Sequence, residues 1–208
     1  MADDDASAME SISFEKVTLS NGLDVILHQD HTIPLVAVNV WYHVGSKDEA
    51  PGRTGFAHLF EHVMFEGSKH HNRSHFEPLQ KAGATLNGST NGDRTNYWED
   101  VPTNYLELAL WLEADRMRGL SINEANLANQ KEAVKQERRL AFDNRPYAIA
   151  ILERWPELAF RNWANSHSLI GSFADLEAAT VDDVTQFFKT YYAPNNAVLA
   201  IAGDFQAA

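Results

Sequence analysis

Two histidines and a glutamate stand close together in an otherwise phenylalanine-rich segment, "GFAHLFEHVMFEG". His58 and His62 are four positions apart, so on a helix their imidazoles lie on one face, with Glu61 beside them. Two imidazoles at this spacing can bind one metal ion and leave the neighbouring carboxylate free to act as a base. A solvated helix face that holds no ion is the alternative on this motif alone.

A second helix, expected from residue 123 to residue 143, carries one unexplained charge. Glu137 falls within its apolar arc, as does Gln130. The apolar residues of that arc are Leu127, Ala133, Val134, Leu140 and Ala141. A carboxylate on a core-facing side is costly unless it is paired or binds a metal. Two interpretations stay open: a buried ion pair with an arginine elsewhere, and a metal ligand.

These two features explain each other if His58, His62 and Glu137 bind one ion together. Two histidines and one glutamate form a common ligand set of catalytic zinc, which keeps a fourth position for water. Glu61 is then the expected catalytic base, which takes a proton from the water that attacks a peptide bond. We expect one Zn²⁺ per chain. Residues 63–136 separate His62 from Glu137, so the site requires a fold that brings distant segments together.

The order of several motifs resembles that of a known family. "HLFEH" is an inverted metalloprotease motif, and a glutamate follows about 75 residues downstream. Further matching stretches are "VWYHVGSKDE", "FEGS", "GATLNGSTNGDRTNYWEDVP", "NQKEAVKQERR", "NRPY" and "YYAPNNAVLAIAGDF". From about Ser13 onward the chain is similar to the pitrilysin and insulinase family of zinc proteases, which includes the mitochondrial processing peptidases.

The resemblance implies roles for the same residues. By position, His58, His62 and Glu137 match the zinc ligands of the family. Glu61 matches its general base. Many relatives have a second acidic residue where this chain has Gln130. The neutral amide is expected to orient a ligand or a water in the second layer around the metal, without adding charge.

The resemblance also implies how a substrate is bound. "LNGST" matches an edge strand that pairs with an extended peptide through backbone hydrogen bonds. Asn87 and Gly88 are the residues expected to face that peptide, and a glycine lets the two backbones approach closely. The alternative for "NGSTNG" is a plain hairpin turn, although "NGD" can serve as that turn as well.

In this family the working protease pairs two homologous halves around its substrate. We therefore expect residues 12–208 to be the zinc-binding N-terminal domain of a longer or paired protease, a fragment that cleaves peptides poorly by itself. The predicted function is that of a zinc metalloendopeptidase. One alternative is a non-catalytic or assembly subunit of a two-subunit protease, which would be expected to have lost ligands or the base. Another is a zinc hydrolase that acts on something other than a peptide.

Strands are expected first along the chain and helices later. The strand segments, identified from alternating apolar residues and turn signals, are 13–19, 22–29, 35–45, 83–90, 94–101 and 197–203. Helices are expected at 56–65, 74–81, 103–119, 123–143, 146–160 and from 180 to about 190. Ser74 with Glu77 predicts a capping box for the second of these. The order predicts an α+β fold, a two-layer sandwich in which a mainly antiparallel, mixed sheet of about six strands has helices packed on one face.

Composition narrows the classes of protein. The 208 residues are 44% apolar, which is enough for a sizeable core, and the start "MADDDASAMES" predicts a disordered acidic tail over residues 1–11. A net charge of −12 argues against nucleic acid as a partner, and the lack of cysteine excludes disulfides and thiolate catalysis. Neither a membrane span nor a signal peptide is found. The sequence predicts a soluble protein but does not determine its compartment, which is periplasmic or extracellular if a leader has been removed and cytoplasmic otherwise.

The other histidines are expected to be structural or solvated. Three of them share the loop "KHHNRSH", where solvated side chains are expected in preference to a second metal site: His70, His71 and His75. Four stand singly and are expected to have structural roles: His28, His31, His43 and His167.

Overall fold

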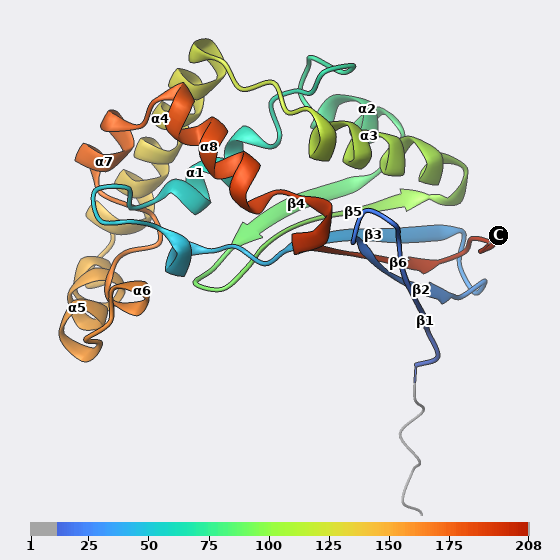
Figure 1. Ribbon diagram of the computed structural model, residues 1–208, viewed down its shortest axis with the longest axis horizontal. Helices are drawn as coiled ribbons and strands as arrows, with labels where there is room; N and C mark the ends of the chain where they lie inside the picture. The colour runs from blue at the N-terminus through green and yellow to red at the C-terminus, as the bar shows by residue number, and fades with distance from the viewer. Residues whose placement is uncertain (1–11, 208) are drawn as a thin grey trace, which may run out of the picture.

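Six strands form one open, mixed sheet in the computed structural model, which describes residues 12–207 (Figure 1). Side by side, they lie in the order β1 (Glu15–Thr18), β2 (Asp24–Gln29), β6 (Ala197–Gly203), β3 (Leu35–Tyr42), β5 (Thr95–Pro102) and β4 (Thr85–Thr90). β2 and β6 run parallel, and the other neighbouring pairs are antiparallel. The predicted mainly antiparallel sheet is confirmed, whereas the predicted tail over residues 1–11 lies outside the described residues.

Helices fill the second layer. They are α1 (Phe56–Val63), α2 (Phe76–Lys81), α3 (Leu106–Arg118), α4 (Glu124–Arg138), α5 (Trp155–Ala159), α6 (Trp163–Ser166), α7 (Phe173–Ala178) and α8 (Val181–Tyr191). A π-helical turn (Arg139–Asp143) prolongs α4, and another (Ala150–Arg154) leads into α5. Figure 1 shows α1, α3, α4 and α8 on the same side of the sheet, which confirms the two-layer α+β arrangement.

Alternating side chains give the sheet one covered face and one open face. Along β3, Val36, Val38 and Val40 are buried, whereas Trp41 is 45% exposed. Successive side chains of a strand point to opposite faces, so the valines meet the helices. Burying such a side chain contributes about 1.5–3 kcal/mol relative to leaving it in water. The apolar alternation of the sequence is therefore what holds the helical layer on one side.

The helices predicted at 74–81 and 146–160 begin later than expected. The capping box of Ser74 and Glu77 is wrong, because α2 begins at Phe76 and the Glu77 carboxylate instead pairs with Lys81 at 2.7 Å, one turn further along. The helix expected at 146–160 begins after Tyr147, whose φ of 65° lies in the left-handed region and interrupts the helical path. The short helices α6 and α7 were not predicted.

The core holds α1 firmly in place. Phe56, Leu59, Phe60 and Val63 recur every three or four residues along the helix, and all four are buried. The ring of Phe60 lies 4.1 Å from that of Tyr192, at the end of α8, inside the larger of two core clusters. The second cluster lies between α3 and the sheet. The helix that carries the two histidines is thus fixed by packing along its opposite side.

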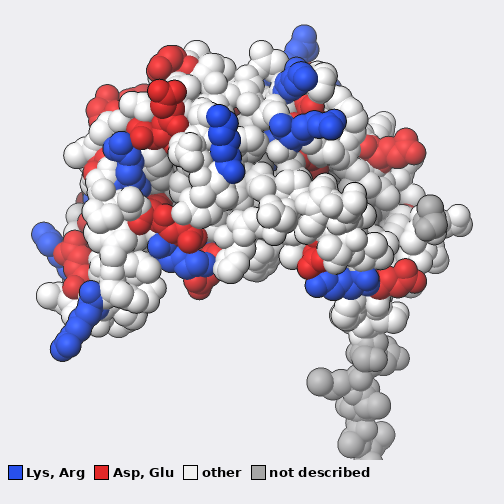
Figure 2. Space-filling model, in the orientation of Figure 1, with Lys and Arg blue, Asp and Glu red and all other residues white. Residues whose placement is uncertain are grey.

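The surface is charged but mixed in sign. On the face seen in Figure 2, acidic and basic side chains are interspersed and do not gather into one basic area. Within residues 12–207, no helix combines the length and apolar character that crossing a membrane requires.

Candidate metal and catalytic site

Helix α1 presents its two histidines to the last turn of α4. Nε2 of His58 and Nε2 of His62 lie 3.5 and 3.4 Å from Oε2 of Glu137. The two imidazole centroids are 4.9 Å apart. Ligand atoms bound to one tetrahedral zinc ion at about 2.0–2.1 Å lie roughly 3.4 Å from one another. The spacing of these donor atoms therefore fits one zinc ion.

The surroundings give the two imidazoles different pKa values. Burial lowers the pKa of His58 to about 4, so its ring is neutral at pH 7, as a metal ligand must be. Burial also acts to lower the pKa of His62, but the hydrogen bond with Glu137 outweighs it and raises that pKa. The same bond lowers the pKa of Glu137. The ionised Glu137 carboxylate thus favours a positive charge beside the two imidazoles. That charge can be a proton on His62, or a metal cation that takes the place of the proton.

Glu137 was singled out as a charge on the core-facing side of its helix, and this expectation is only partly right. Its side chain is 45% exposed, and Leu140 of the same arc is 71% exposed. Lys135 and Arg138, which the wheel places off the apolar arc, are buried because acidic residues of α7 and of the turn before α5 pair with them. Within residues 12–207, Glu137 pairs with the two histidines and with no arginine. The alternative of a buried Glu–Arg pair is therefore wrong for the described chain.

Glu61 lies beside the histidines and is held by the neighbouring strand. Oγ1 of Thr90, on β4, donates a hydrogen bond to Oε2 of Glu61 at 2.5 Å. Burial raises the pKa of Glu61, and the bond from Thr90 opposes this rise. A carboxylate with a raised pKa accepts protons more effectively near neutral pH. Thr90 was not among the residues expected from the sequence, although it follows Gly88 by two residues and so lies on the same face of the strand.

β4 is an edge strand, because it pairs with β5 alone among the described strands. In the turn that follows it, the Asn91 N–H donates to the Arg94 carbonyl at 2.9 Å. Hydrogen-bonded pairs alternate along an antiparallel ladder, so Gly88 falls where the backbone groups point away from β5. The turn thus lies at residues 91–94, where "NGD" was expected to serve as one, and residues 87–90 of "NGSTNG" belong to the strand and not to a hairpin turn.

The two residues expected to face a substrate lie on opposite faces of β4. Asn87 is exposed, and its Oδ1 accepts a hydrogen bond from the Gly88 N–H at 2.8 Å. Gly88 faces α1, where an added Cβ would lie 3.2 Å from Cγ of Glu61 and 3.1 Å from the ring of Phe65. The glycine therefore lets the strand lie against the helix that carries Glu61.

Gln130 belongs to α4, and its side chain reaches the segment that follows α1. Its amide donates to Glu66, just beyond α1, and it contributes to raising the pKa of His62. The structure thus places Gln130 next to one of the expected ligands. The side chain is neutral and adds no charge there, and its expected role of orienting a ligand stays a prediction.

A second group of ionisable side chains is buried between β5 and α3. His75, Glu99 and Glu113 present three potential ligand atoms within 4.8 Å of one another. Arg116 pairs with Glu113 there, so the positive charge is already supplied by the protein. We interpret this group as an ion-pair network. The prediction of a solvated loop is wrong for His75, which is 4% exposed, and right for His70, whose side chain is 55% exposed.

The chain matches two family models. Residues 24–172 match the model of the insulinase family (peptidase family M16), and residues 178–208 match that of the peptidase M16 inactive domain. The zinc protease PqqE of Helicobacter pylori is 32% identical over 192 residues, which are 91% of this chain and 43% of that protein. The probable mitochondrial-processing peptidase subunit beta of Arabidopsis thaliana is 25% identical over 187 residues, 89% of this chain and 35% of that protein.

Solved structures of peptidases also resemble this chain. The crystal structure of a protease from Helicobacter pylori has a TM-score of 0.88 and 31% identity, and the match covers 94% of this chain and 47% of that one. The first half of the periplasmic protease PqqL from Escherichia coli has a TM-score of 0.83 and 22% identity, covers 93% of this chain and 43% of that one, and shares the fold. The chain spans less than half the length of each of these relatives. It belongs to the insulinase family of peptidases.

Proposed function

We propose that this member of the insulinase family is the zinc-binding part of a metalloendopeptidase. The observation that carries the proposal is the meeting of three donor atoms, in which Nε2 of His58 and of His62 lie 3.5 and 3.4 Å from Oε2 of Glu137. Glu61 lies beside them on α1. The choice of zinc is supported by this ligand set and by relatives that are named zinc proteases.

The proposed chemistry divides between the metal and the protein. Zinc, when bound, acidifies water and polarises a carbonyl group. Thr90 holds Oε2 of Glu61, which leaves Oε1 to accept a proton from the attacking water. As the new C–O bond forms and the peptide C–N bond breaks, Glu61 passes that proton to the leaving amine nitrogen. The carboxylate is then ionised again and ready for another cycle.

The peptide is proposed to bind as an additional strand on β4. The backbone of Gly88 points to the free edge of the sheet, where an extended peptide can exchange hydrogen bonds whatever its side chains are. In the free protein the Gly88 N–H donates a hydrogen bond to Oδ1 of Asn87 at 2.8 Å. When the peptide binds, this N–H donates instead to a carbonyl oxygen of the peptide. The substrate backbone then lies next to the strand that holds the base.

The complete enzyme is proposed to contain a second homologous half. This is supported by the chain's span of less than half of its relatives, and by a solved relative described as the first half of a periplasmic protease. The second half would surround the substrate from the opposite side. The chain by itself is therefore expected to bind about one zinc ion and to cleave peptides poorly.

Metal content and peptide cleavage test the proposal in the longest native form of the protein. Glu61→Gln should keep the zinc and lose activity by at least about 100-fold, because it removes the base. Glu137→Gln should lose the zinc, whereas Glu124→Gln, an exposed glutamate in the first turn of α4, should lose neither.

Three results would contradict parts of the proposal. Full activity of Glu61→Gln would exclude it as the base, and unchanged zinc affinity of Glu137→Gln would exclude it as a ligand. A zinc-loaded native protein that cleaves no peptide would favour the alternative, a non-catalytic or assembly subunit of a two-subunit protease.

A further inference from the structure

Helix α1 is capped at its N-terminus by a carboxylate from outside the helix. Oε2 of Glu49 accepts a hydrogen bond from the Gly55 N–H at 2.9 Å, and Oε1 accepts one from the Ala57 N–H at 2.8 Å. The first N–H groups of a helix lack partners within it, and their partial positive charge favours a carboxylate. Glu49 therefore fixes the first turn of α1, and His58 is the next residue along.

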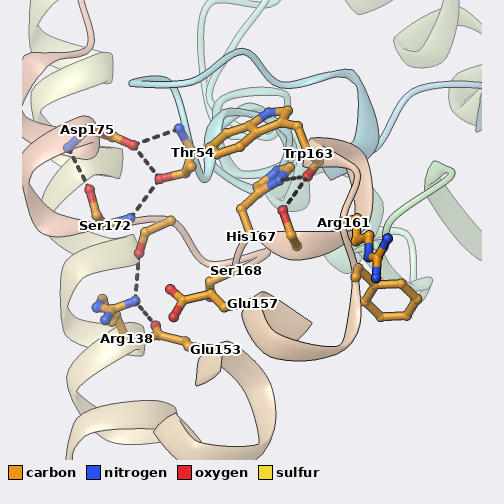
Figure 3. Close-up of a pocket in the computed structure, with 13 residues that line it drawn as sticks. Thr54, Arg138, Glu153, Glu157, Arg161, Trp163, His167, Ser168, Ser172 and Asp175 are labelled. Atoms are coloured by element: carbon orange, nitrogen blue, oxygen red, sulfur yellow. Dashed lines mark hydrogen bonds and ion pairs between the residues drawn. The ribbon is translucent and has the colours of Figure 1, made fainter. Parts of the chain in front are cut away.

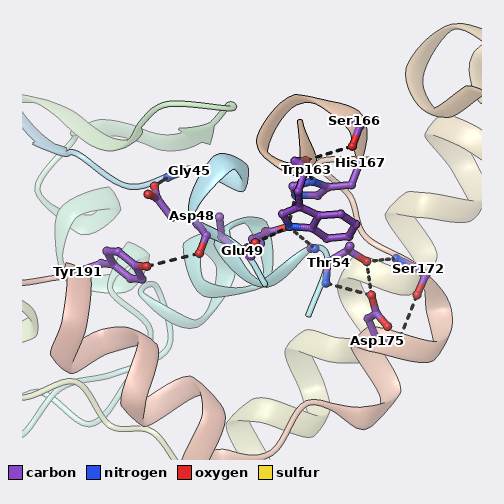
Figure 4. Close-up of polar contacts among 12 residues, drawn as sticks. Gly45, Asp48, Glu49, Thr54, Trp163, Ser166, His167, Ser172, Asp175 and Tyr191 are labelled. Carbon is purple, nitrogen blue, oxygen red and sulfur yellow. Dashed lines mark hydrogen bonds and ion pairs between the residues drawn. The ribbon is translucent and has the colours of Figure 1, made fainter. Parts of the chain in front are cut away.

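A histidine from a distant part of the chain holds that carboxylate (Figure 4). Nε2 of His167 lies 3.1 Å from Oε2 of Glu49, and its Nδ1 lies 2.7 Å from the carbonyl oxygen of Trp163. The imidazole stacks on the Trp163 indole at 4.4 Å, and the indole N–H donates to the backbone carbonyl of Glu49 at 2.6 Å. Both ring nitrogens face acceptors, so an imidazolium satisfies both. The side chains of His167 and Glu49 are 5% and 0% exposed.

The pair is held together against the cost of burial. Burial acts to lower the pKa of His167, but its hydrogen bonds to Glu49 and to Trp163 outweigh it and raise that pKa. Burial raises the pKa of Glu49, although His167 and the two amides of α1 oppose the rise. If the histidine were removed, the carboxylate would stay buried with the helix amides as its remaining partners.

The segment that follows His167 also contacts α4, the helix that carries Glu137. The carbonyl of Gly171 accepts a hydrogen bond from Arg138 at 2.7 Å, and Arg138 directly follows Glu137. Gly171 has a φ of 76°, and a Cβ there would lie 2.6 Å from Cα of Gly55. This close contact brings the two segments together at the start of α1. Figure 3 shows Arg138 and His167 on the walls of a cavity of about 510 Å³ between these elements.

Two further contacts complete the attachment. Asp175 accepts hydrogen bonds from both the N–H and the hydroxyl of Thr54, at 3.0 and 2.5 Å, just before α1. Lys131 of α4 donates to the carbonyls of Glu177 and Ala179 at 2.6 and 3.1 Å. Residues 163–179, called the brace below, thus bind the start of α1 on one side and about two turns of α4, from Lys131 to Arg138, on the other.

We propose that the brace sets the distance between the two metal-bearing helices, and that His167 is its principal positioning residue, acting through Glu49. The inference rests on the proposed function, since it assigns a role relative to the ligands His58, His62 and Glu137. The physical reason is that the ligands come from two helices whose relative position is not fixed by either helix alone. An error of a few tenths of an ångström at the donor atoms weakens metal binding.

Zinc affinity of the folded chain tests this separately from stability. His167→Ala should weaken zinc binding by about tenfold in a chelator competition, the scale seen when a residue that orients ligands is removed. Leu112→Ala, which removes a buried side chain from the second core cluster, should lower the stability of the metal-free chain and leave zinc affinity unchanged. His167→Gln keeps a donor toward Glu49 and should recover part of the affinity. The absorption spectrum of the cobalt-substituted protein should change with His167→Ala and not with Leu112→Ala.

Equal zinc affinity in wild type and His167→Ala, with both chains folded, would overturn the inference and leave the proposed function standing. Failure of the wild type to bind zinc would overturn the proposed function, and this inference with it. If His167→Ala does not fold, Glu49→Gln replaces it, since this change keeps the side-chain volume and weakens the ion pair. Unchanged affinity in Glu49→Gln would overturn the inference equally.

Discussion

Arg116 is the buried charge whose removal is expected to cost the fold most. Its side chain is 1% exposed and pairs with Glu113, which is 4% exposed, through Nε at 3.0 Å and through Nη2. The guanidinium also lies 4.4 Å from the centre of the Tyr97 ring and donates to the carbonyl of Met64, at the end of α1. Arg116→Met keeps most of the volume and removes the charge.

The magnitude follows from the burial of the partner. Without Arg116, Glu113 keeps its place in the interior but loses its counter-charge, and breaking a buried pair in this way costs about 3–5 kcal/mol. Folded domains are stable by only about 5–15 kcal/mol, so a large part of the total would be lost. Replacing both partners with apolar residues removes the uncompensated charge. Arg116→Met combined with Glu113→Leu should therefore be more stable than Arg116→Met alone.

The sign of the pH dependence should reverse as well. In the wild type, burial acts to raise the pKa of Glu113, but Arg116 and His75 outweigh it and lower that pKa. The stability contributed by this group is thus present above the unfolded pKa of 4.5 and lost as pH falls below it. In Arg116→Met burial is unopposed by the guanidinium, the folded pKa rises above the unfolded value, and the variant should gain stability relative to wild type as pH falls from 7 toward 5.

Urea unfolding of the metal-free chain at several pH values measures the stability lost in Arg116→Met, the stability recovered in the double variant, and the pH dependence of each. Lys81→Met is the matched control, because it breaks an exposed pair with Glu77 and should cost less than about 1 kcal/mol. A loss under about 1 kcal/mol for Arg116→Met would refute the reasoning. So would a double variant that is no more stable than Arg116→Met.

Four further results are expected. Thr90→Val keeps the side-chain shape but removes the hydroxyl that holds Glu61, so kcat of the assembled enzyme should fall about tenfold with zinc content unchanged, whereas Thr85→Val on the outer face of β4 should have no effect. Zinc at about 100 times its Kd should raise the free energy of unfolding by about 2.7 kcal/mol, and thermal denaturation should show no such gain for Glu137→Gln. Burial acts to raise the pKa of Asp115, but hydrogen bonds from Ser68 and His70 outweigh it and lower that pKa to about 2. Its contribution is therefore present above the unfolded value of 3.8 and lost as pH falls toward 2, so denaturant unfolding should show Asp115→Asn about 1–2 kcal/mol less stable at pH 7 and nearly equal to wild type near pH 2. Phe60→Ala should cost about 3–5 kcal/mol in urea unfolding, and a loss below 1 kcal/mol would contradict its central place in the core.

Much of the fold could be predicted because its signals are local. The alternating apolar residues of "LVAVNV" predicted the strand β3, and a helix was predicted over residues 56–65, where α1 lies. Both patterns repeat with the period of the backbone itself, so they need no knowledge of what lies opposite. The capping box at Ser74 failed because two local partners competed for Glu77, and Lys81 prevailed.

The burial of α4 could not be predicted in the same way. A helical wheel identifies an apolar arc but not which neighbouring elements cover each side of the helix. Lys135 and Arg138 are buried because Glu177 and Glu153 reach them from α7 and from the turn before α5. Leu140 is exposed, although the wheel places it on the core side.

Part of the candidate site also follows from local sequence signals, and part depends on tertiary packing. His58, Glu61 and His62 are brought together by one helical turn, so their spacing in the chain was enough to place them side by side. The approach of Glu137 to within 3.5 Å, the hold of Thr90 on Glu61, and the pairing of His167 with Glu49 each join segments far apart in the chain. Such contacts depend on how helices and strands pack against one another, because the period of one element carries no information about its distance from another. For this protein the spacing of His58, Glu61 and His62 was decided by local geometry, and the approach of Glu137 that completes the candidate site was decided by tertiary packing.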